Sequence, residues 1–370
     1  MSLLSLDVSK CVRTTNKFST CKKCVEVCPT QTITIAEQIP SFIPNDCVGC
    51  GGCIAVCPDV AYSLDDFSSI NYIFSLLEHK RDTLTCKELI PCLAALSVEE
   101  LIALALLHPE ELRLDRGYCS ECEIAQTNEP LIEARVEEAN FILEAIENTK
   151  RLRFEDVGES VEQKENNRRE FFAKLNLKDA IKAKQKFENE VEATLEEEKT
   201  HQVSYEDIQK IRNQKGIPDR RKLLLMALQK TTPPSVFHTV SIEDVSFISQ
   251  KILDEDTCTN CQMCYRICPT EALSSNKDNS SIFFDPTSCI KCNSCHEVCE
   301  PESLTLRSVF DLEVLYNPKR QTLASFTMKR CDECGMPFVY RGGEVMCNRC
   351  RIEEEEAMNL WGIKPEDRSF

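Results

Sequence analysis

Cysteine spacing is the feature that most limits what this chain can fold into. Three runs follow the pattern Cys-x2-Cys-x2-Cys-x3-Cys and begin at Cys47, Cys258 and Cys289. A fourth run begins at Cys11 and differs only in its first gap, which is nine residues long. The chain holds 24 cysteines in 370 residues. Thiolates at this spacing wrap one face of an iron–sulfur cluster, so the pattern indicates a metal protein.

The remaining features of the sequence argue against a disulfide scaffold. The N-terminus lacks the basic segment and apolar stretch of a secretory signal. The longest uninterrupted apolar run covers residues 101–107, far short of the ~20 residues that cross a bilayer. We therefore expect a cytoplasmic protein with reduced thiols and no direct membrane insertion. The net charge of −17 argues against nucleic acid as a partner.

The runs come in adjacent pairs, and the pairs repeat. Residues 24–30 read CVEVCPT, and residues 264–270 read CYRICPT. Short stretches with strand character lie between the runs of each pair, at 32–35, 41–43 and 281–284. The chain is therefore expected to hold a duplicated unit, called here the first module (1–64) and the second module (256–310).

Both modules resemble bacterial two-cluster ferredoxins, although Glu300 stands where the other runs have proline. The resemblance implies two [4Fe–4S] clusters in each module. Each cluster would take three cysteines from one run and the last cysteine of the other. The implied ligand sets are site A (Cys11, Cys21, Cys24, Cys57), site B (Cys28, Cys47, Cys50, Cys53), site C (Cys268, Cys289, Cys292, Cys295) and site D (Cys258, Cys261, Cys264, Cys299).

A third group of cysteines forms two Cys-x2-Cys knuckles, twelve residues apart. Two such knuckles on facing turns give the tetrahedral four-sulfur site of a zinc ribbon. A rubredoxin-like iron site is the alternative, but it usually has a glycine after both knuckles, and only the first knuckle has one here. We expect zinc at this ribbon site, which consists of Cys331, Cys334, Cys347 and Cys350.

Four cysteines remain, and they define site E: Cys86, Cys92, Cys119 and Cys122. The sequence around them predicts a strand that starts near Leu89, a helix with a capping box of Ser97 and Glu100, and a strand over 111–115. A second helix is expected to start near Pro130. In this β–α–β–turn–α order, Cys92 and the pair Cys119 and Cys122 lie at the carboxyl ends of neighbouring strands, where α/β sheets bind ligands.

Residues 84–147 also weakly resemble the delta subunit of methyl-viologen-reducing hydrogenases. This small iron–sulfur protein passes electrons between a hydrogenase and a heterodisulfide reductase. The matching features are Ile90-Pro-Cys-Leu93 before the helix and Gly117-Tyr-Cys-Ser-Glu-Cys122 after the next strand. The resemblance implies a [2Fe–2S] cluster at site E. From the residues alone, another iron–sulfur centre, a zinc site or simply buried thiols stay open.

The middle of the chain, residues 131–230, lacks cysteine and is expected to be helical. It is interpreted as a spacer or as a docking region for a partner subunit. Its apolar stripes are too short to be stable alone in water, so the chain itself or a partner must cover them. One stripe comprises Ile132, Val136, Ala139, Leu143 and Ile146, and another comprises Ala180, Ala183, Phe187, Val191 and Leu195.

The predicted fold class is α+β with several domains. It contains two ferredoxin-like 2[4Fe–4S] modules, a small α/β segment (65–130), the helical middle region (131–230), a linker (231–255) and a zinc-ribbon tail (311–370). The expected cofactors are four [4Fe–4S] clusters, zinc and a further centre at site E. No catalytic residues or nucleotide loop are identified, and His296, inside a cysteine run, is expected at the surface.

The sequence therefore predicts a polyferredoxin that is not itself an enzyme. It would relay electrons between a redox enzyme subunit, such as a formate dehydrogenase or hydrogenase, and an electron carrier protein. Two alternatives stay open: a redox sensor or cluster-assembly protein, and a reductase that acts at site E. With four oxidised clusters and zinc bound, the net charge falls to about −27.

Overall fold

The computed structural model describes residues 3–36, 38–86, 88–157 and 215–362. All 24 cysteines lie in these segments, and none of them forms a disulfide. Within the same segments, no helix has the length and apolar character needed to cross a membrane.

In the first module, the first and last strands pair with each other. Strand β1 (Leu4–Leu6) pairs antiparallel with β4 (Tyr62–Leu64), and β2 (Ile33–Ala36) pairs with β3 (Ile39–Phe42). The connections between these strands carry the cysteine runs and form short helices. These are α1 (Val12–Thr15), α2 (Lys23–Glu26) and α3 (Gly52–Val56).

The second module repeats this plan. Strand β9 (Lys251–Leu253) pairs with β12 (Leu304–Leu306), β10 (Leu273–Ser275) pairs with β11 (Ser281–Phe284), and the short helices are α11 (Met263–Arg266) and α12 (Ser294–Glu297). Two pairings extend it: β14 (Gln321–Ser325) joins β11, and β8 (Thr239–Ser241) pairs with β13 (Val309–Asp311), which precedes α13 (Glu313–Tyr316).

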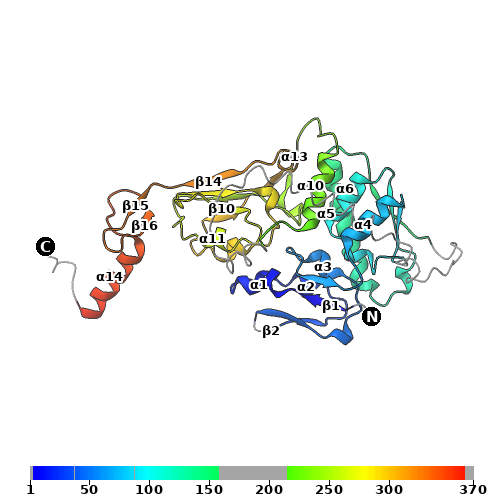
Figure 1. Cartoon of the computed structure of the whole chain (residues 1–370), viewed down its shortest axis with the longest axis horizontal. Coiled ribbons are helices and arrows are strands. Elements are labelled where there is room, and N and C mark those ends of the chain that lie inside the picture. The colour runs from blue at the N-terminus through cyan, green and yellow to red at the C-terminus, as the bar shows by residue number, and fades with distance from the viewer. Residues whose placement is uncertain (1–2, 37, 87, 158–214, 363–370) are drawn as a thin grey trace.

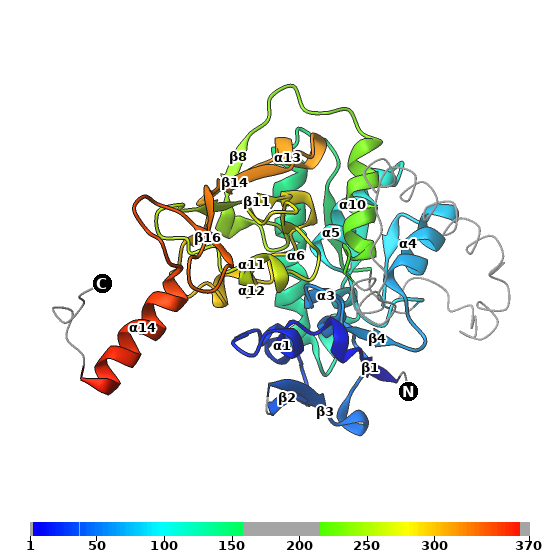
Figure 2. The same cartoon turned by 60° about the vertical axis from the view of Figure 1, so that its left-hand side comes forward.

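Between the modules lies an α/β unit with a parallel sheet in the order β5–β6–β7. Its strands are β5 (Thr83–Leu84), β6 (Leu112–Asp115) and β7 (Leu152–Glu155). Its helices are α4 (Ser69–Glu78), α5 (Val98–Leu107), α6 (Ala125–Ala145) and α10 (Asp219–Gln229). Figures 1 and 2 show α5, α6 and α10 beside one another, next to both modules.

This unit confirms the predicted capping box and corrects several boundaries. Ser97 and Glu100 cap α5 reciprocally. The strand expected from Leu89 is instead a buried connection with a short 3-10 turn, η3 (Leu93–Ala95), and the strand itself is β5. Helix α6 starts five residues before Pro130, which lies inside it. Because α6 runs through residue 130, it joins the α/β unit to the region expected to be a separate spacer.

The largest apolar core explains what covers the first predicted stripe. Ile132, Val136, Ala139, Leu143 and Ile146 are each at most 3% exposed, and they pack with residues of α4, α5 and α10. The same core includes Val240, Val245 and Phe310 beside the second module. Residues 231–255 are therefore a packed segment with two strands, not a linker. The stripe at 180–195 lies outside the described residues.

The C-terminal part extends away from the rest of the chain (Figures 1 and 2). It consists of the hairpin β15 (Met328–Arg330) and β16 (Pro337–Val339), followed by α14 (Asn348–Trp361).

Candidate metal centres

Sites B and C each surround one small cavity. Cys28 of the first run and the three leading cysteines of the second run line the cavity at site B. The equivalent four cysteines line the cavity at site C. Apolar side chains complete both linings, such as Ile33 at site B and Phe284 at site C. Four convergent thiols in apolar surroundings fit a cubane cluster, and the crossed origin of the fourth thiol agrees with the ferredoxin resemblance.

The thiols of sites A and D are also neighbours. Burial and then the nearby Cys21 and Cys11 raise the pKa of Cys24. The pKa of Cys57, from the other run, is raised to about 11 by burial, and Cys21 contributes. At site D, burial, Cys261, Cys258 and Cys299 raise the pKa of Cys264 to about 12. Thiols with such pKa values keep their protons at neutral pH, so metal binding must displace them.

The long gap after Cys11 does not separate it from the rest of site A. Helix α1 begins directly after Cys11, which is its N-cap. Arg13 then donates from Nη1 to the carbonyl of Cys21 at 2.9 Å, and from Nε to the carbonyl of Gln38. The bond to Cys21 spans the insertion and keeps Cys11 and Cys21 close, and the bond to Gln38 ties the insertion to the β2–β3 turn.

Hydrogen-bond donors are directed at several sulfurs. The amide of Ala61 donates to Cys57 Sγ at 3.3 Å, and the amide of Asn260 donates to Cys258 Sγ at 3.4 Å. The hydroxyl of Tyr62 is buried beside Cys24 and has no other hydrogen-bond partner in the described part of the chain. Such donors stabilise the more negative, reduced state of a cluster.

Comparisons with known proteins identify these modules. Two family descriptions, each of a 4Fe-4S dicluster domain, match residues 19–61 and residues 250–300. The chain contains two 4Fe-4S dicluster domains. The first match lies within the first module and the second covers most of the second module, so the modules are called the first and second dicluster domains below.

Two relatives show the same likeness over a short stretch. A protein of Hydrogenibacillus schlegelii named "Ferredoxin 7Fe" is 46% identical over 44 residues, which are 12% of this chain and 56% of the relative. One subunit of an ion-translocating oxidoreductase complex from Methanosarcina acetivorans is 39% identical over 44 residues, 12% of this chain and 17% of the relative. The chain thus spans less than two thirds of either relative. These findings show iron–sulfur domains of the ferredoxin kind in this chain.

The two dicluster domains differ at one equivalent position. Leu4 opens β1 and lines site B, whereas Lys251 opens β9 and lines site C. Burial lowers the pKa of Lys251, but Cys289 and the other thiols of site C raise it more, so the net shift is upward. Lys251 donates to His296 Nε2 at 2.8 Å, and His296 Nδ1 donates to the carbonyl of Leu304. The expectation of a surface His296 is therefore wrong: it is half-buried.

The structure also brings together the four cysteines of site E. Burial, and then Cys86 and Cys122, raise the pKa of Cys92. Burial raises the pKa of Cys119 to about 11, and all three other cysteines contribute. Cys119 follows β6, as expected, but Cys92 follows the buried connection and caps η3, so its expected position at the end of a strand is wrong. Cys86 instead follows β5, the parallel neighbour of β6. Cys122 is exposed, which places this site at the surface.

Site E is adjacent to site B of the first dicluster domain. The side-chain amide of Asn128 donates to Cys92 Sγ at 3.5 Å and also hydrogen-bonds to Cys50. Gly51, next to Cys50, has a φ of +78°, and a Cβ placed there would lie 2.7 Å from Ala95 Cβ. Glycine therefore permits both the local turn and the close approach of the first dicluster domain to η3.

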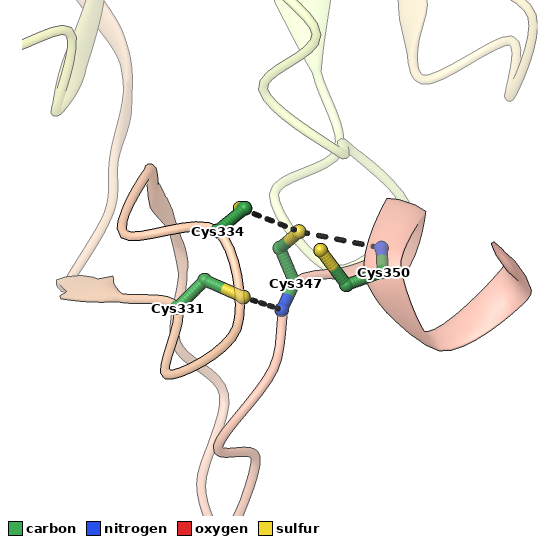
Figure 3. A group of neighbouring side chains, drawn as sticks. All are labelled: Cys331, Cys334, Cys347 and Cys350. Atoms are coloured by element: carbon green, nitrogen blue, oxygen red, sulfur yellow. Dashed lines mark hydrogen bonds between the residues drawn. The ribbon is translucent and has the colours of Figure 1, made fainter. Parts of the chain in front are cut away.

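The ribbon site is the most compact of the cysteine groups. Its four sulfurs lie within 4.8 Å of one another, and Figure 3 shows them converging from the hairpin loop and from the start of α14. Cys334 Sγ and Cys347 Sγ are 3.8 Å apart, close to the ~3.8 Å expected between sulfurs of a tetrahedron with Zn–S bonds of about 2.3 Å. Backbone amides, including that of Cys347, lower the pKa of Cys331 to about 6. The residues fit a single ion.

Several residues that organise these centres have no motif in the sequence. Arg220 donates to the carbonyls of Ala55, Cys57 and Pro58, and Arg221 donates to those of Thr287, Cys289 and Phe247. Both arginines bind the carboxylate of Glu99 on α5. The available signal was a pair of arginines that lies shortly before the apolar run from Leu223 to Leu228.

Proposed function

We propose that this chain is a polyferredoxin that relays electrons through four [4Fe–4S] clusters at sites A to D. The observation that carries the proposal is that each matched dicluster domain encloses a cavity lined by three cysteines of one run and the last cysteine of the other, at sites B and C. When bound, each cluster supplies one-electron redox chemistry. The chain contributes thiolate ligands, N–H donors to sulfur and apolar surroundings, all of which tune the reduction potential.

We further propose that site E holds an iron–sulfur cluster, and that the ribbon site holds zinc. Among the described residues, only the ribbon cysteines lie close enough together to share a single ion. The more widely spaced thiols of site E suit a cluster of more than one metal. Because Asn128 contacts both Cys92 and Cys50, site E would exchange electrons with site B.

The partners would be a redox enzyme subunit, such as a formate dehydrogenase or hydrogenase, and an electron carrier protein. One relative is named as a subunit of an oxidoreductase complex, which supports a role as an electron-transfer subunit and not as the enzyme. Reduced thiols support a cytoplasmic location. A net charge of −17 before metal binding favours a partner with a basic docking face, and rising salt should weaken that association.

Metal analysis after anaerobic purification tests the proposal. Four cubanes and one ribbon predict about sixteen irons and one zinc per chain, and a two-iron centre at site E raises the iron to about eighteen. Fewer than about twelve irons in undamaged protein would contradict the assignment of four cubanes.

Two alternative functions need different tests. A cluster-assembly protein would transfer its iron to an apo-acceptor, whereas a relay should be reduced and reoxidised repeatedly without loss of iron. A reductase at site E would show a substrate-dependent change in its spectrum. Stable reversible reduction without either effect favours the relay.

A further inference from the structure

The two dicluster domains meet at a carboxylate. Glu297 lies on α12 of the second dicluster domain, two residues after Cys295 and two before Cys299. Its Oε1 accepts hydrogen bonds from the amide and the hydroxyl of Thr20, both at 2.7 Å. Its Oε2 accepts from Asn16 Nδ2 at 2.9 Å. One side chain therefore receives three hydrogen bonds from the first dicluster domain.

Both partners of Glu297 lie in the long gap between Cys11 and Cys21. Asn16 is buried and ends α1, and Thr20 directly precedes Cys21. The extra residues that distinguish this run are thus the residues that contact the other domain. Lys291 of the second dicluster domain also lies near Lys23 of the first. Burial lowers the pKa of Lys291, and the positive charge of Lys23 lowers it further.

The contact creates a short bonded path between clusters. From the sulfur of Cys21 the path follows the backbone to the amide of Thr20, crosses one hydrogen bond to Glu297, and continues along α12. There it reaches Cys295, a ligand of site C, and Cys299, a ligand of site D. Electrons tunnel more readily through bonded atoms than across a gap. A second connection between the domains runs through α10, where Arg220 and Arg221 bind the carbonyls of Cys57 and Cys289 and both pair with Glu99.

We infer that Glu297 is the positioning residue of the junction through which site A of the first dicluster domain exchanges electrons with the second dicluster domain. This inference rests on the proposed relay function. In each transfer, one electron leaves the cluster of one domain, which is oxidised, and enters a cluster of the other, which is reduced. No bond is formed or broken, and no proton is transferred.

The test uses the full, metal-loaded chain and three variants. Glu297→Ala removes all three hydrogen bonds. Glu297→Gln keeps an acceptor oxygen for Thr20 and should largely rescue the junction. Glu26→Ala is the matched control, because Glu26 also lies two residues after one cysteine and two before the next. Within the described part of the chain, its carboxylate pairs with the exposed Lys22 and not with the other domain. It removes the same charge near a cluster without touching the junction.

The measurement is rapid-freeze EPR after reduction with less than one electron per chain. It follows how fast the electron redistributes between the spectra of the two domains. We expect Glu297→Ala to slow this step by about tenfold or more, while Glu297→Gln and Glu26→Ala stay near the wild-type rate. Iron content and reduction potentials are measured on the same samples.

The outcomes separate this inference from the relay function. If Glu297→Ala redistributes electrons as fast as wild type and Glu26→Ala, the junction is refuted even though the relay stands. Equal slowing in Glu26→Ala would also refute the junction, because loss of a negative charge near a cluster would then explain the slower transfer. If wild type binds its iron but is not reversibly reduced, the relay function itself fails.

Discussion

Arg220 and Arg221 are consecutive on α10, yet their guanidinium groups bind different dicluster domains. Arg220 donates to the carbonyl of Cys57 at 2.6 Å, and Arg221 donates to the carbonyl of Cys289 at 2.9 Å. Glu99 lies between them and pairs with both. All three residues are less than 9% exposed. A buried carboxylate on α5 thus fixes the relative position of one ligand loop from each domain.

Removal of Glu99 should destabilise the chain strongly. Glu99→Ala leaves two buried guanidinium groups without their carboxylate, and we expect a loss of about 3–5 kcal/mol in the free energy of unfolding. The free energy of unfolding is measured by chemical denaturation of the metal-loaded protein under anaerobic conditions, monitored by circular dichroism.

The control is Glu111→Ala, which breaks the exposed Glu111–Arg153 pair. It should cost about 0–1 kcal/mol. Equal stability losses in the two variants would show that the buried triad does not hold the domains together.

The difference between Leu4 and Lys251 predicts unequal potentials at sites B and C. Lys251 places a buried positive charge beside the thiolates of site C, so it favours the reduced state there. Lys251→Leu should lower the potential of site C by about 50 mV, equivalent to about 1 kcal/mol for one electron. Redox titration followed by EPR measures the shift.

The reciprocal change is Leu4→Lys, which should raise the potential of site B. A surface variant, Lys329→Leu, serves as the control for total charge. No change at site C in Lys251→Leu would mean that solvent or His296 screens this charge.

Loss of site E should remove only part of the iron. The double variant Cys119→Ser with Cys122→Ser removes two of its four thiols, and we expect about two fewer irons per chain. The four cubane sites should keep their iron and their EPR signals. Metal analysis of the purified variant decides this, and an unchanged iron content would exclude an iron–sulfur centre at site E.

The ribbon should lose zinc independently of the clusters. Cys334→Ser removes one of four ligands from a site whose sulfurs are already convergent, and structural zinc is needed for such small units to fold. We expect zinc to fall from one per chain toward zero while iron stays constant. Iron at this site in wild-type protein, with no zinc, would show a rubredoxin-like centre instead.

The cysteine groups were predictable from the sequence, because the cysteines of each run are only a few residues apart and their spacing is visible in the sequence itself. The capping box of Ser97 and Glu100 was predictable for the same reason. The strand expected at Leu89 was wrong because a buried apolar connection and a strand have similar composition. The junction at Glu297 and the arginine pair depend on contacts between residues 26 to 281 positions apart, which no local pattern encodes.

If this chain holds one-electron centres at sites A to D, a count of the electrons it takes up tests them most directly. Anaerobic coulometric titration of the purified, iron-loaded protein, with EPR spin quantification at each step, gives the number taken up and returned. We predict about four reversible electrons per chain from sites A to D, and about five if site E is redox-active. Reversible uptake of two electrons or fewer by fully loaded protein would contradict it.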